Sequence, residues 1–281
     1  MNVLSSPGRI IVGVGILLVS FLLHCGKEDT TGPDNQPTPP EVPPASTFII
    51  DFESFPDTSG ILAELAMPLV DTTRHNWGWA AIAVAVWNTI LKVTLAVPVA
   101  AFLESFHHPP VRQPDGSWHW TYSFRVAGIL HTARLEARTV EGGIQWDMFI
   151  SKENAYTDFH WFEGFSDLPN TSGTWTLNLN PNDPIPFLRI EWQRDVQTET
   201  ISVRYTIIVP NSPDNGSYIF YGVSAGSPYD RFYDILFAID SNLIEIEWNH
   251  LSFIGRIKDP RHFGDDTWHC WDELLFDAVC P

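Results

Sequence analysis

Hydrophobic and polar residues alternate along the second half of the chain. In residues 118–126, Trp118, Trp120, Tyr122 and Phe124 fall on one face and polar residues fall on the other. This period of two is typical of a β-strand with one buried and one wet face. Similar patterns recur at 131–139, 144–150, 157–163, 173–179, 187–194, 200–209, 217–223, 231–239, 243–249 and 251–257. The loops between them are rich in Pro, Asn, Asp and Gly, so we expect about ten antiparallel strands.

Residues 76–106 break this pattern because they are apolar on every side and rich in Ala. They predict a helix to about Ala96, with a kink or break at Pro98, since proline removes a backbone donor. A helix that is apolar all round must be buried. Two alternatives stay open for this segment: a transmembrane helix, or strand character at residues 90–97, which are rich in β-branched side chains.

The simplest fold that covers the apolar side of the strands is mainly β. We expect a strongly curved antiparallel meander, or an incomplete barrel, wrapped around the long helix; a β-sandwich with the helix at one end is the alternative. Residues 47–56 predict a short strand and residues 60–67 a helical turn or two. A short C-terminal helix is expected at 268–279. This general shape resembles the helix-filled β folds of envelope lipoproteins, such as periplasmic lipoprotein carriers, without a shared motif.

The amino terminus carries an export pattern. Residues 10–23 are fourteen apolar or small residues, a length that suits a signal-peptide core better than a membrane span. The segment resembles a bacterial lipoprotein signal: Leu22, Leu23 and His24 occupy the lipobox positions, and Cys25 would take the lipid. His24 stands where such signals usually carry Gly, Ala or Ser. An ordinary signal peptide or an uncleaved anchor is the alternative.

The resemblance implies three regions and a location. Residues 1–24 would be the signal peptide, residues 25–46 the lipidated cysteine with a Pro-rich tether, and residues 47–281 one β-rich domain. We expect a lipid-anchored protein of the cell envelope, at the outer membrane, facing the periplasm or the surface. With Cys25 lipidated, Cys270 and Cys280 remain to form a disulfide in an oxidising compartment; two free thiols are the alternative.

Charge and motifs limit the chemistry. The formal charge is −18, from 34 acidic and 16 basic residues, which argues against binding of nucleic acid through phosphate contacts. The sequence has no phosphate-binding loop, no nucleophile elbow and no C-x-x-C motif, so no catalytic residue and no cofactor is predicted. The densest polar cluster is a weak candidate for a metal site, although its spacing also suits a turn or a helix cap. It comprises His262, Asp265, Asp266 and His269.

Paired carboxylates and tryptophans are the remaining candidates for function. A glycan hydrolase needs two carboxyl groups, and three pairs qualify: Asp158 with Glu163, Glu191 with Asp195, and Glu245 with Glu247. These strand faces also carry Arg or Asn, so exposed ion pairs are the favoured explanation. Most of the 12 Trp alternate with core residues. Trp161, Trp268 and Trp271 are left as candidate ligand-binding rings on the surface.

These observations favour a non-enzymatic binding or structural protein of the envelope. The mouth of a curved sheet is suited to an apolar ligand wherever the helix leaves it unfilled. A glycan-acting hydrolase that uses two carboxylates is the alternative function.

Overall fold

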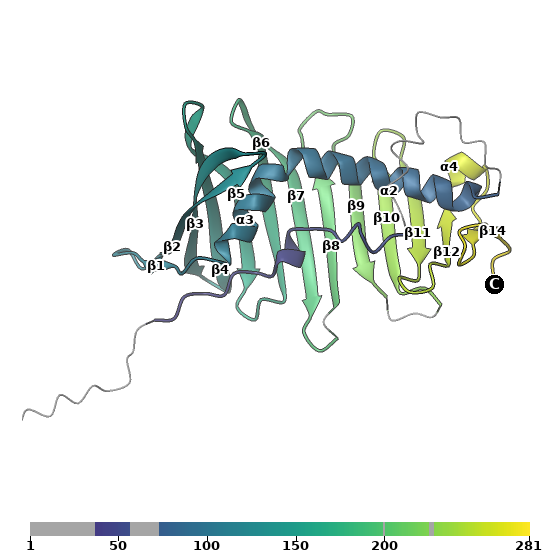
Figure 1. Cartoon of the computed structure of the whole chain (residues 1–281), viewed down its shortest axis with the longest axis horizontal. Helices are drawn as coiled ribbons and strands as arrows, with labels where there is room; N and C mark the ends of the chain where they lie inside the picture. Colours follow the sequence, from purple (N-terminus) through teal and green to yellow (C-terminus); the bar gives the residue numbers. More distant parts are fainter. Residues whose placement is uncertain (1–36, 57–72, 199, 225–227) are drawn as a thin grey trace, which may run out of the picture. The chain divides into compact units, whose positions relative to one another are not determined.

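A single antiparallel sheet dominates the computed structural model of this protein, which describes residues 37–56, 73–198, 200–224 and 228–281 (Figure 1). Every strand pairs with the next one along the chain, and within the described part β1 does not pair with β14, so the sheet is open. The strands are β1 (Val111–Arg112), β2 (Trp118–Val126), β3 (Ile129–Val140), β4 (Gly143–Lys152), β5 (Tyr156–Asp167), β6 (Ser172–Asn180), β7 (Asp183–Asp195), β8 (Thr200–Ile207), β9 (Tyr218–Val223), β10 (Arg231–Phe237), β11 (Asn242–Trp248), β12 (Gly255–Lys258), β13 (His269–Trp271) and β14 (Asp277–Ala278). All of them lie in the unit formed by residues 39–281.

The mainly antiparallel β architecture is confirmed, but the number of strands and the closure of the sheet differ from the prediction. The described chain has fourteen strands rather than about ten. The additional strands include β1, β13 and β14, which have only two or three residues and are too short to show a period. There is one open sheet, neither a barrel nor a sandwich.

The apolar segment forms two helices, where one long helix was expected. Helix α2 (His75–Thr94) ends before Leu95, and α3 (Ala96–Ser105) begins directly after it, with an angle of 70° between them. The break lies three residues before Pro98, in the turn that precedes it: the proline has no N–H for the carbonyl of Thr94, the last residue of α2, and fits in the first turn of α3. Among the described residues, no single helix is long and apolar enough to span a membrane, although the bent pair passes that test of length and composition.

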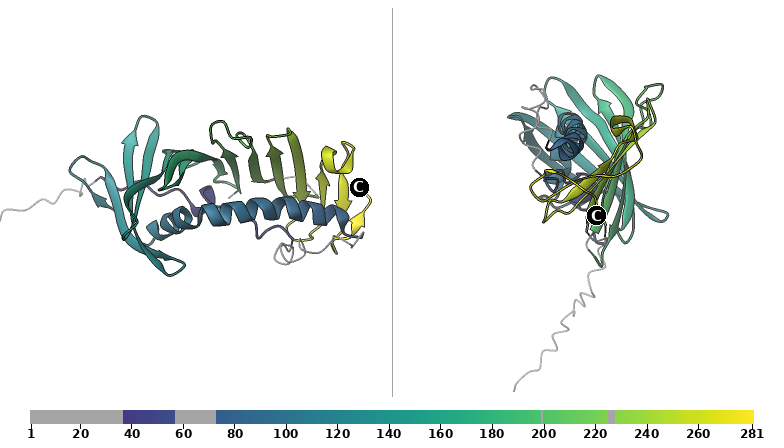
Figure 2. Two further views of the ribbon diagram at one scale, coloured as in Figure 1. Left: turned by 90° about the horizontal axis from the view of Figure 1, so that it is seen from above. Right: turned by 90° about the vertical axis from the view of Figure 1, so that its right-hand side faces the viewer.

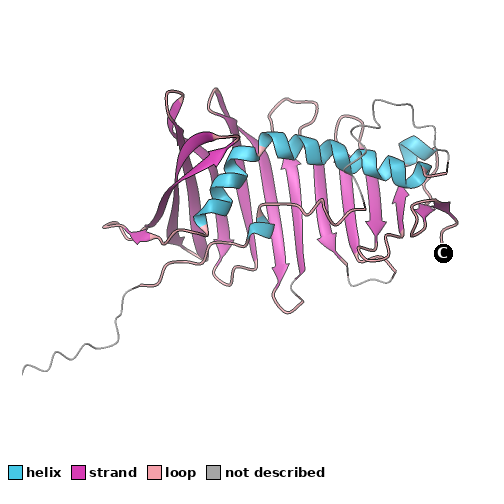
Figure 3. Ribbon diagram, viewed as in Figure 1, coloured by secondary structure: helices cyan, strands magenta, loops and turns pink. Residues whose placement is uncertain are grey.

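The two helices cover one face of the sheet (Figures 2 and 3). Helix α3 packs on β2 and β3, and α2 reaches β12, β13 and β14. Ala80, Val84 and Trp87 of α2 are buried, yet Val86, Ile90 and Val93 on its other side are 38 %, 42 % and 74 % exposed. The prediction that this helix is buried on all sides is therefore wrong, because an open sheet covers only one side of it.

Residues 48–55 complete the cover without forming the predicted strand. They follow a 3-10 turn, η1 (Ala45–Thr47). Phe48 packs on Phe162 and Trp175, whereas Phe55 packs on Trp248 and Trp271, so the segment crosses the inner face from β5 and β6 to β11 and β13. The helical turn expected at 60–67 lies outside the described residues.

The prediction of a C-terminal helix at 268–279 is also wrong, because this part of the chain contains β13 and β14. The short helix comes earlier, as α4 (Pro260–Phe263), because Asp259 caps its N-terminus and Gly264 ends it with a positive φ of 76°. Asp265 then accepts hydrogen bonds from Thr267 in a turn, and the chain continues as β13. The expected disulfide between Cys270 and Cys280 is present and links β13 to the tail.

Glycines placed beneath tryptophan rings allow the inner face to pack tightly. Gly164 lies directly opposite Trp175, Gly173 opposite Trp192, and Gly255 opposite Trp271. A Cβ atom on Gly164 would lie 2.1 Å from Cε3 of Trp175 and 2.7 Å from the carbonyl oxygen of Thr174. Each ring therefore occupies the space that a side chain on the neighbouring strand would need.

Gly164→Ala is expected to destabilise the fold by about 2–3 kcal/mol, because the buried Trp175 ring must move out of its packed position. Urea unfolding followed by circular dichroism measures the change. Gly78→Ala is the matched control, since a Cβ there meets no atom within 4 Å. Gly78 lies inside α2, so this substitution should stabilise the fold by up to about 1 kcal/mol. Equal effects of the two substitutions would contradict the packing argument.

Candidate functional site

An apolar groove opens on the inner face where the two helices meet. Residues 48–52 form one wall, the junction of α2 and α3 forms the other, and Tyr205 of β8 closes the floor. We call this space, of about 190 Å³, the inner groove. Its lining comprises Phe48, Ile49, Ile50, Phe52, Asn88, Leu91, Lys92, Leu95, Ala96, Val99 and Tyr205.

Two polar side chains reach the inner groove from α2. Asn88 and Lys92 are four residues apart, so they lie one helical turn from each other on the same side. The buried Oδ1 atom of Asn88 has no hydrogen-bond partner among the described residues. Lys92 is exposed and forms no ion pair with any described side chain. Burial raises the pKa of Tyr205 far above its usual value, so its hydroxyl stays neutral.

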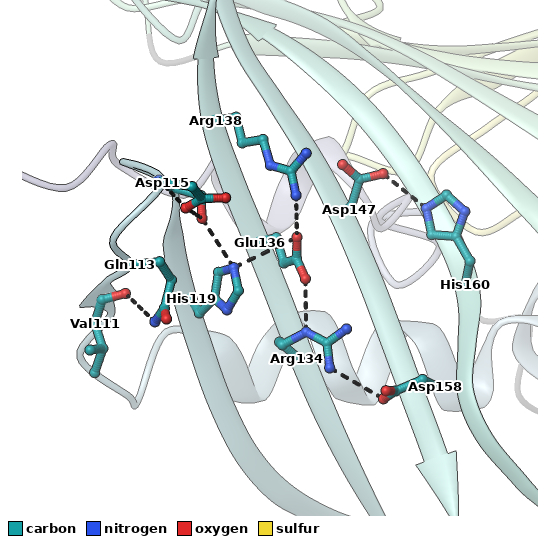
Figure 4. Close-up of polar contacts among 11 residues, drawn as sticks. Val111, Gln113, Asp115, His119, Arg134, Glu136, Arg138, Asp147, Asp158 and His160 are labelled. Atoms are coloured by element: carbon teal, nitrogen blue, oxygen red, sulfur yellow. Dashed lines mark hydrogen bonds and ion pairs between the residues drawn. The ribbon is translucent and has the colours of Figure 1, made fainter.

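A second polar assembly lies on the opposite, outer face of the sheet and is centred on Glu136 (Figure 4). The Glu136 carboxylate is only 9 % exposed and binds Nε of Arg134 at 2.8 Å and Nη2 of Arg138 at 3.0 Å. Nε2 of His119 lies 3.7 Å away. These two guanidinium groups shield the central carboxylate from water.

Asp147 and Glu163 continue this cross-strand row on β4 and β5. Glu136 lies opposite Asp147, and Asp147 lies opposite Glu163. Asp147 Oδ1 is 3.0 Å from Nε2 of His160, and the two side chains point toward each other in Figure 4. The hydrogen bond to Asp147 raises the pKa of His160, and it outweighs partial burial, which acts in the opposite direction.

A β-bulge in β5 produces this arrangement, and the sequence analysis did not predict it. Met148 pairs with Phe162 and Phe149 pairs with His160, so Trp161 is an extra residue in the ladder. Trp161 points inward and packs on Tyr156 and Phe159. The break in strict alternation, from a polar His160 to the consecutive rings Trp161 and Phe162, is the sequence signal that identifies the bulge.

The three candidate tryptophans fall in different places. Trp161 and Trp271 are buried, so neither is a surface ring. Trp268 is half-buried and is covered by cations: the guanidinium carbon of Arg256 lies 4.1 Å from its ring centre and Nζ of Lys258 lies 5.1 Å away.

The four residues of the weak candidate metal site contact different partners and do not form one cluster. His262 Nε2 lies 3.2 Å from Nε2 of His75 on α2, whereas His269 Nε2 lies 3.1 Å from Asp265. Asp266 lies 3.9 Å from Lys258. Among the described residues, the three-ligand group that converges within 4.8 Å is a different one, Asp147, His160 and Glu163.

Several candidate carboxylates are held in ion pairs on the outer face. Asp158 binds Arg134 at 3.3 Å, Glu247 binds Arg256 at 2.6 Å, and Glu245 binds Lys258. Asp195 caps a turn by accepting hydrogen bonds from the amides of Gln197 and Thr198, and Glu191 lines an outer surface depression.

The carboxyl group with a raised pKa is one that the sequence argument missed. Partial burial, together with the charge of Glu245 directly opposite it, raises the pKa of Asp234 on β10 to about 6. The sequence analysis considered pairs of carboxylates only within one strand, so it overlooked this cross-strand pair.

No protein-family model, curated protein or solved structure matches the chain. Cys25 and the lipobox-like segment lie outside the described residues. The function therefore has to be inferred from the groove and the clusters themselves.

The raised pKa of Asp234 predicts a pH dependence of stability. Because its folded-state pKa exceeds the unfolded value, the folded chain binds more protons between about pH 4 and pH 6, and this stabilisation is lost as pH rises through 6. From pH 5 to pH 7, the wild type should lose about 1 kcal/mol more stability than Asp234→Asn, allowing for partial solvent screening. Urea midpoints at both pH values measure this difference, and parallel pH profiles would contradict it.

Proposed function

We propose that this protein is an envelope-anchored, non-catalytic binding protein for a single-chain amphiphile, such as a fatty acid. The observation that carries the proposal is an apolar groove lined by Asn88 and Lys92. Among the described residues, the covered carboxamide oxygen of Asn88 has no hydrogen-bond partner and Lys92 has no ion-pair partner. The apolar walls of the inner groove suit an acyl chain, and Asn88 and Lys92 suit its polar head.

The polar groups give the proposal an energetic basis. A buried oxygen without a hydrogen-bond donor costs about 1–3 kcal/mol. A ligand hydroxyl or a protonated acid group that donates to Asn88 Oδ1 would remove this cost. Lys92 lies one turn further along α2 and has no described ion-pair partner, so it is available for a carboxylate.

The size of the groove limits the ligand. Its volume of about 190 Å³ exceeds the roughly 150 Å³ of a cavity that holds benzene, but it is smaller than the roughly 300–1,000 Å³ of most drug-sized pockets. The groove therefore fits a short length of one alkyl chain, with the rest of the ligand outside, rather than a two-chain lipid.

Val99→Trp is expected to abolish binding of laurate, because the larger ring fills the inner groove that Val99 lines. Val93→Trp is the matched control: Val93 is on the exposed side of α2, so affinity should stay unchanged. Calorimetric titration of the purified full chain with laurate measures both. Equal binding by the wild type and Val99→Trp, or no binding by the wild type, would refute the proposal.

The contribution of the head group is measured separately by comparing laurate with dodecanol. Lys92→Gln should weaken laurate binding by about tenfold, since an ion pair near the surface is replaced by a neutral contact, and should leave dodecanol binding nearly unchanged. A uniform loss for both ligands would show that Lys92 acts through packing rather than through charge.

The anchor is the second part of the proposal and rests on residues 10–25. Cells that express the wild type should incorporate labelled palmitate into the chain, and Cys25→Ala should abolish that label, because this thiol is the acceptor. Cys280→Ser is the control, because Cys280 forms the disulfide with Cys270 and is not part of the lipobox-like segment. Label that persists in Cys25→Ala would remove the anchor while leaving the groove argument intact.

A glycan hydrolase is the alternative function, and Asp234 is the observation that favours it. Its raised pKa and its position opposite Glu245 provide an acid beside a carboxylate, as glycoside hydrolysis requires. The ion pair between Glu245 and Lys258 argues for a structural role of that carboxylate. The binding function is favoured because the inner groove has a shaped interior, whereas these two carboxyl groups lie on the outer face of the sheet.

A further inference from the structure

We propose a binding site for a divalent transition-metal ion, with Zn²⁺ as the reference ion, formed by Asp147, His160 and Glu163 on the outer face. This site is independent of the inner groove, because it lies on the opposite side of the sheet. One candidate ligand atom from each residue lies within 4.8 Å of the other two.

The bulge in β5 is what brings two of the ligands together. In a regular strand, His160 and Glu163 are an odd number of residues apart and would point to opposite faces. The extra residue Trp161 shifts the alternation, so both side chains lie on the outer face while Trp161 and Phe162 are buried. Bulges occur often beside functional sites, where they redirect a side chain.

The third ligand comes from the neighbouring strand. Asp147 lies directly opposite Glu163 in the ladder, and its Oδ1 atom is 3.0 Å from Nε2 of His160. The ring of Phe149 stacks on the imidazole of His160, with centres 4.9 Å apart, and restricts its orientation. The carbonyl oxygen of His160 accepts a hydrogen bond from Nδ2 of Asn178 at 2.8 Å, which fixes the backbone at the bulge.

The charges around these ligands leave room for a cation. Two carboxylates directly opposite each other repel, and the Glu163 carboxylate has no ion-pair or hydrogen-bond partner among the described residues. The two nearby guanidinium groups, of Arg134 and Arg138, are already bound to Glu136. Arg189 lies in the same cross-strand row, but Thr176 separates it from Glu163. A divalent ion would balance both carboxylates at once.

The donor set indicates the class of ion. One imidazole nitrogen and two carboxylate oxygens suit Zn²⁺ and its neighbours in the first transition series, whereas Mg²⁺ and Ca²⁺ prefer oxygen ligands alone. Three protein ligands leave at least one coordination position for water or for another ligand.

Titration of the purified full chain with ZnCl₂ tests the site. The wild type should bind one equivalent at micromolar concentration, and a large excess of Mg²⁺ should not displace it. His160→Gln, Asp147→Asn and Glu163→Gln should each weaken binding by about tenfold or more. Co²⁺ should give visible absorption bands in the wild type that are lost in His160→Gln.

His262→Gln is the matched control because it removes a histidine that contacts His75, away from the proposed site. It should leave Zn²⁺ binding unchanged. Thermal unfolding without metal checks that each variant is folded, and the near-isosteric Asp147→Asn keeps the result interpretable if His160→Gln unfolds. Absence of binding at about 1 mM Zn²⁺, or binding lost in His262→Gln and kept in the three ligand variants, would overturn the proposal.

Discussion

The apolar face of a long open sheet must be shielded from water, and the rest of this structure follows from that requirement. A closed barrel shields its own interior, but an open sheet needs a separate layer. Here the layer is assembled from α2, α3 and residues 48–55, which together reach from β2 to β14. The pairing of glycine with tryptophan on adjacent strands gives this layer a dense surface on which to pack.

The inner groove is a consequence of how that cover is made. The groove lies where the three covering segments meet, beside the 70° bend between α2 and α3. Asn88 and Lys92 are on the turns of α2 that lead to this bend. A covered oxygen without a hydrogen-bond partner among the described residues weakens the packing at this junction.

The sequence predicted the strands well because each long strand buries one face, which produces alternation over many residues. It predicted Cys270–Cys280 because cysteine pairing needs no knowledge of the fold. It failed for the C-terminal helix because local capping by Asp265 fits a turn as well as a helix, and pairing of β13 with β12 decided the outcome. The break between the two helices has a local signal, Pro98, whereas the groove beside it is lined by residues 48–52, which lie far away in the sequence. Such long-range contacts have no local signal.

The bulge at Trp161 shows why the two faces of the sheet cannot be understood separately. One inserted residue places an additional aromatic ring in the core, against Tyr156 and Phe159, and at the same time brings His160 beside Asp147 and Glu163. Removing the bulge would return the strand to regular alternation and send one of these polar side chains inward, where an unpaired charge is costly. The packing of Trp161 therefore stabilises the outer arrangement: the energy gained by burying the ring offsets the repulsion between two carboxylates on the opposite face.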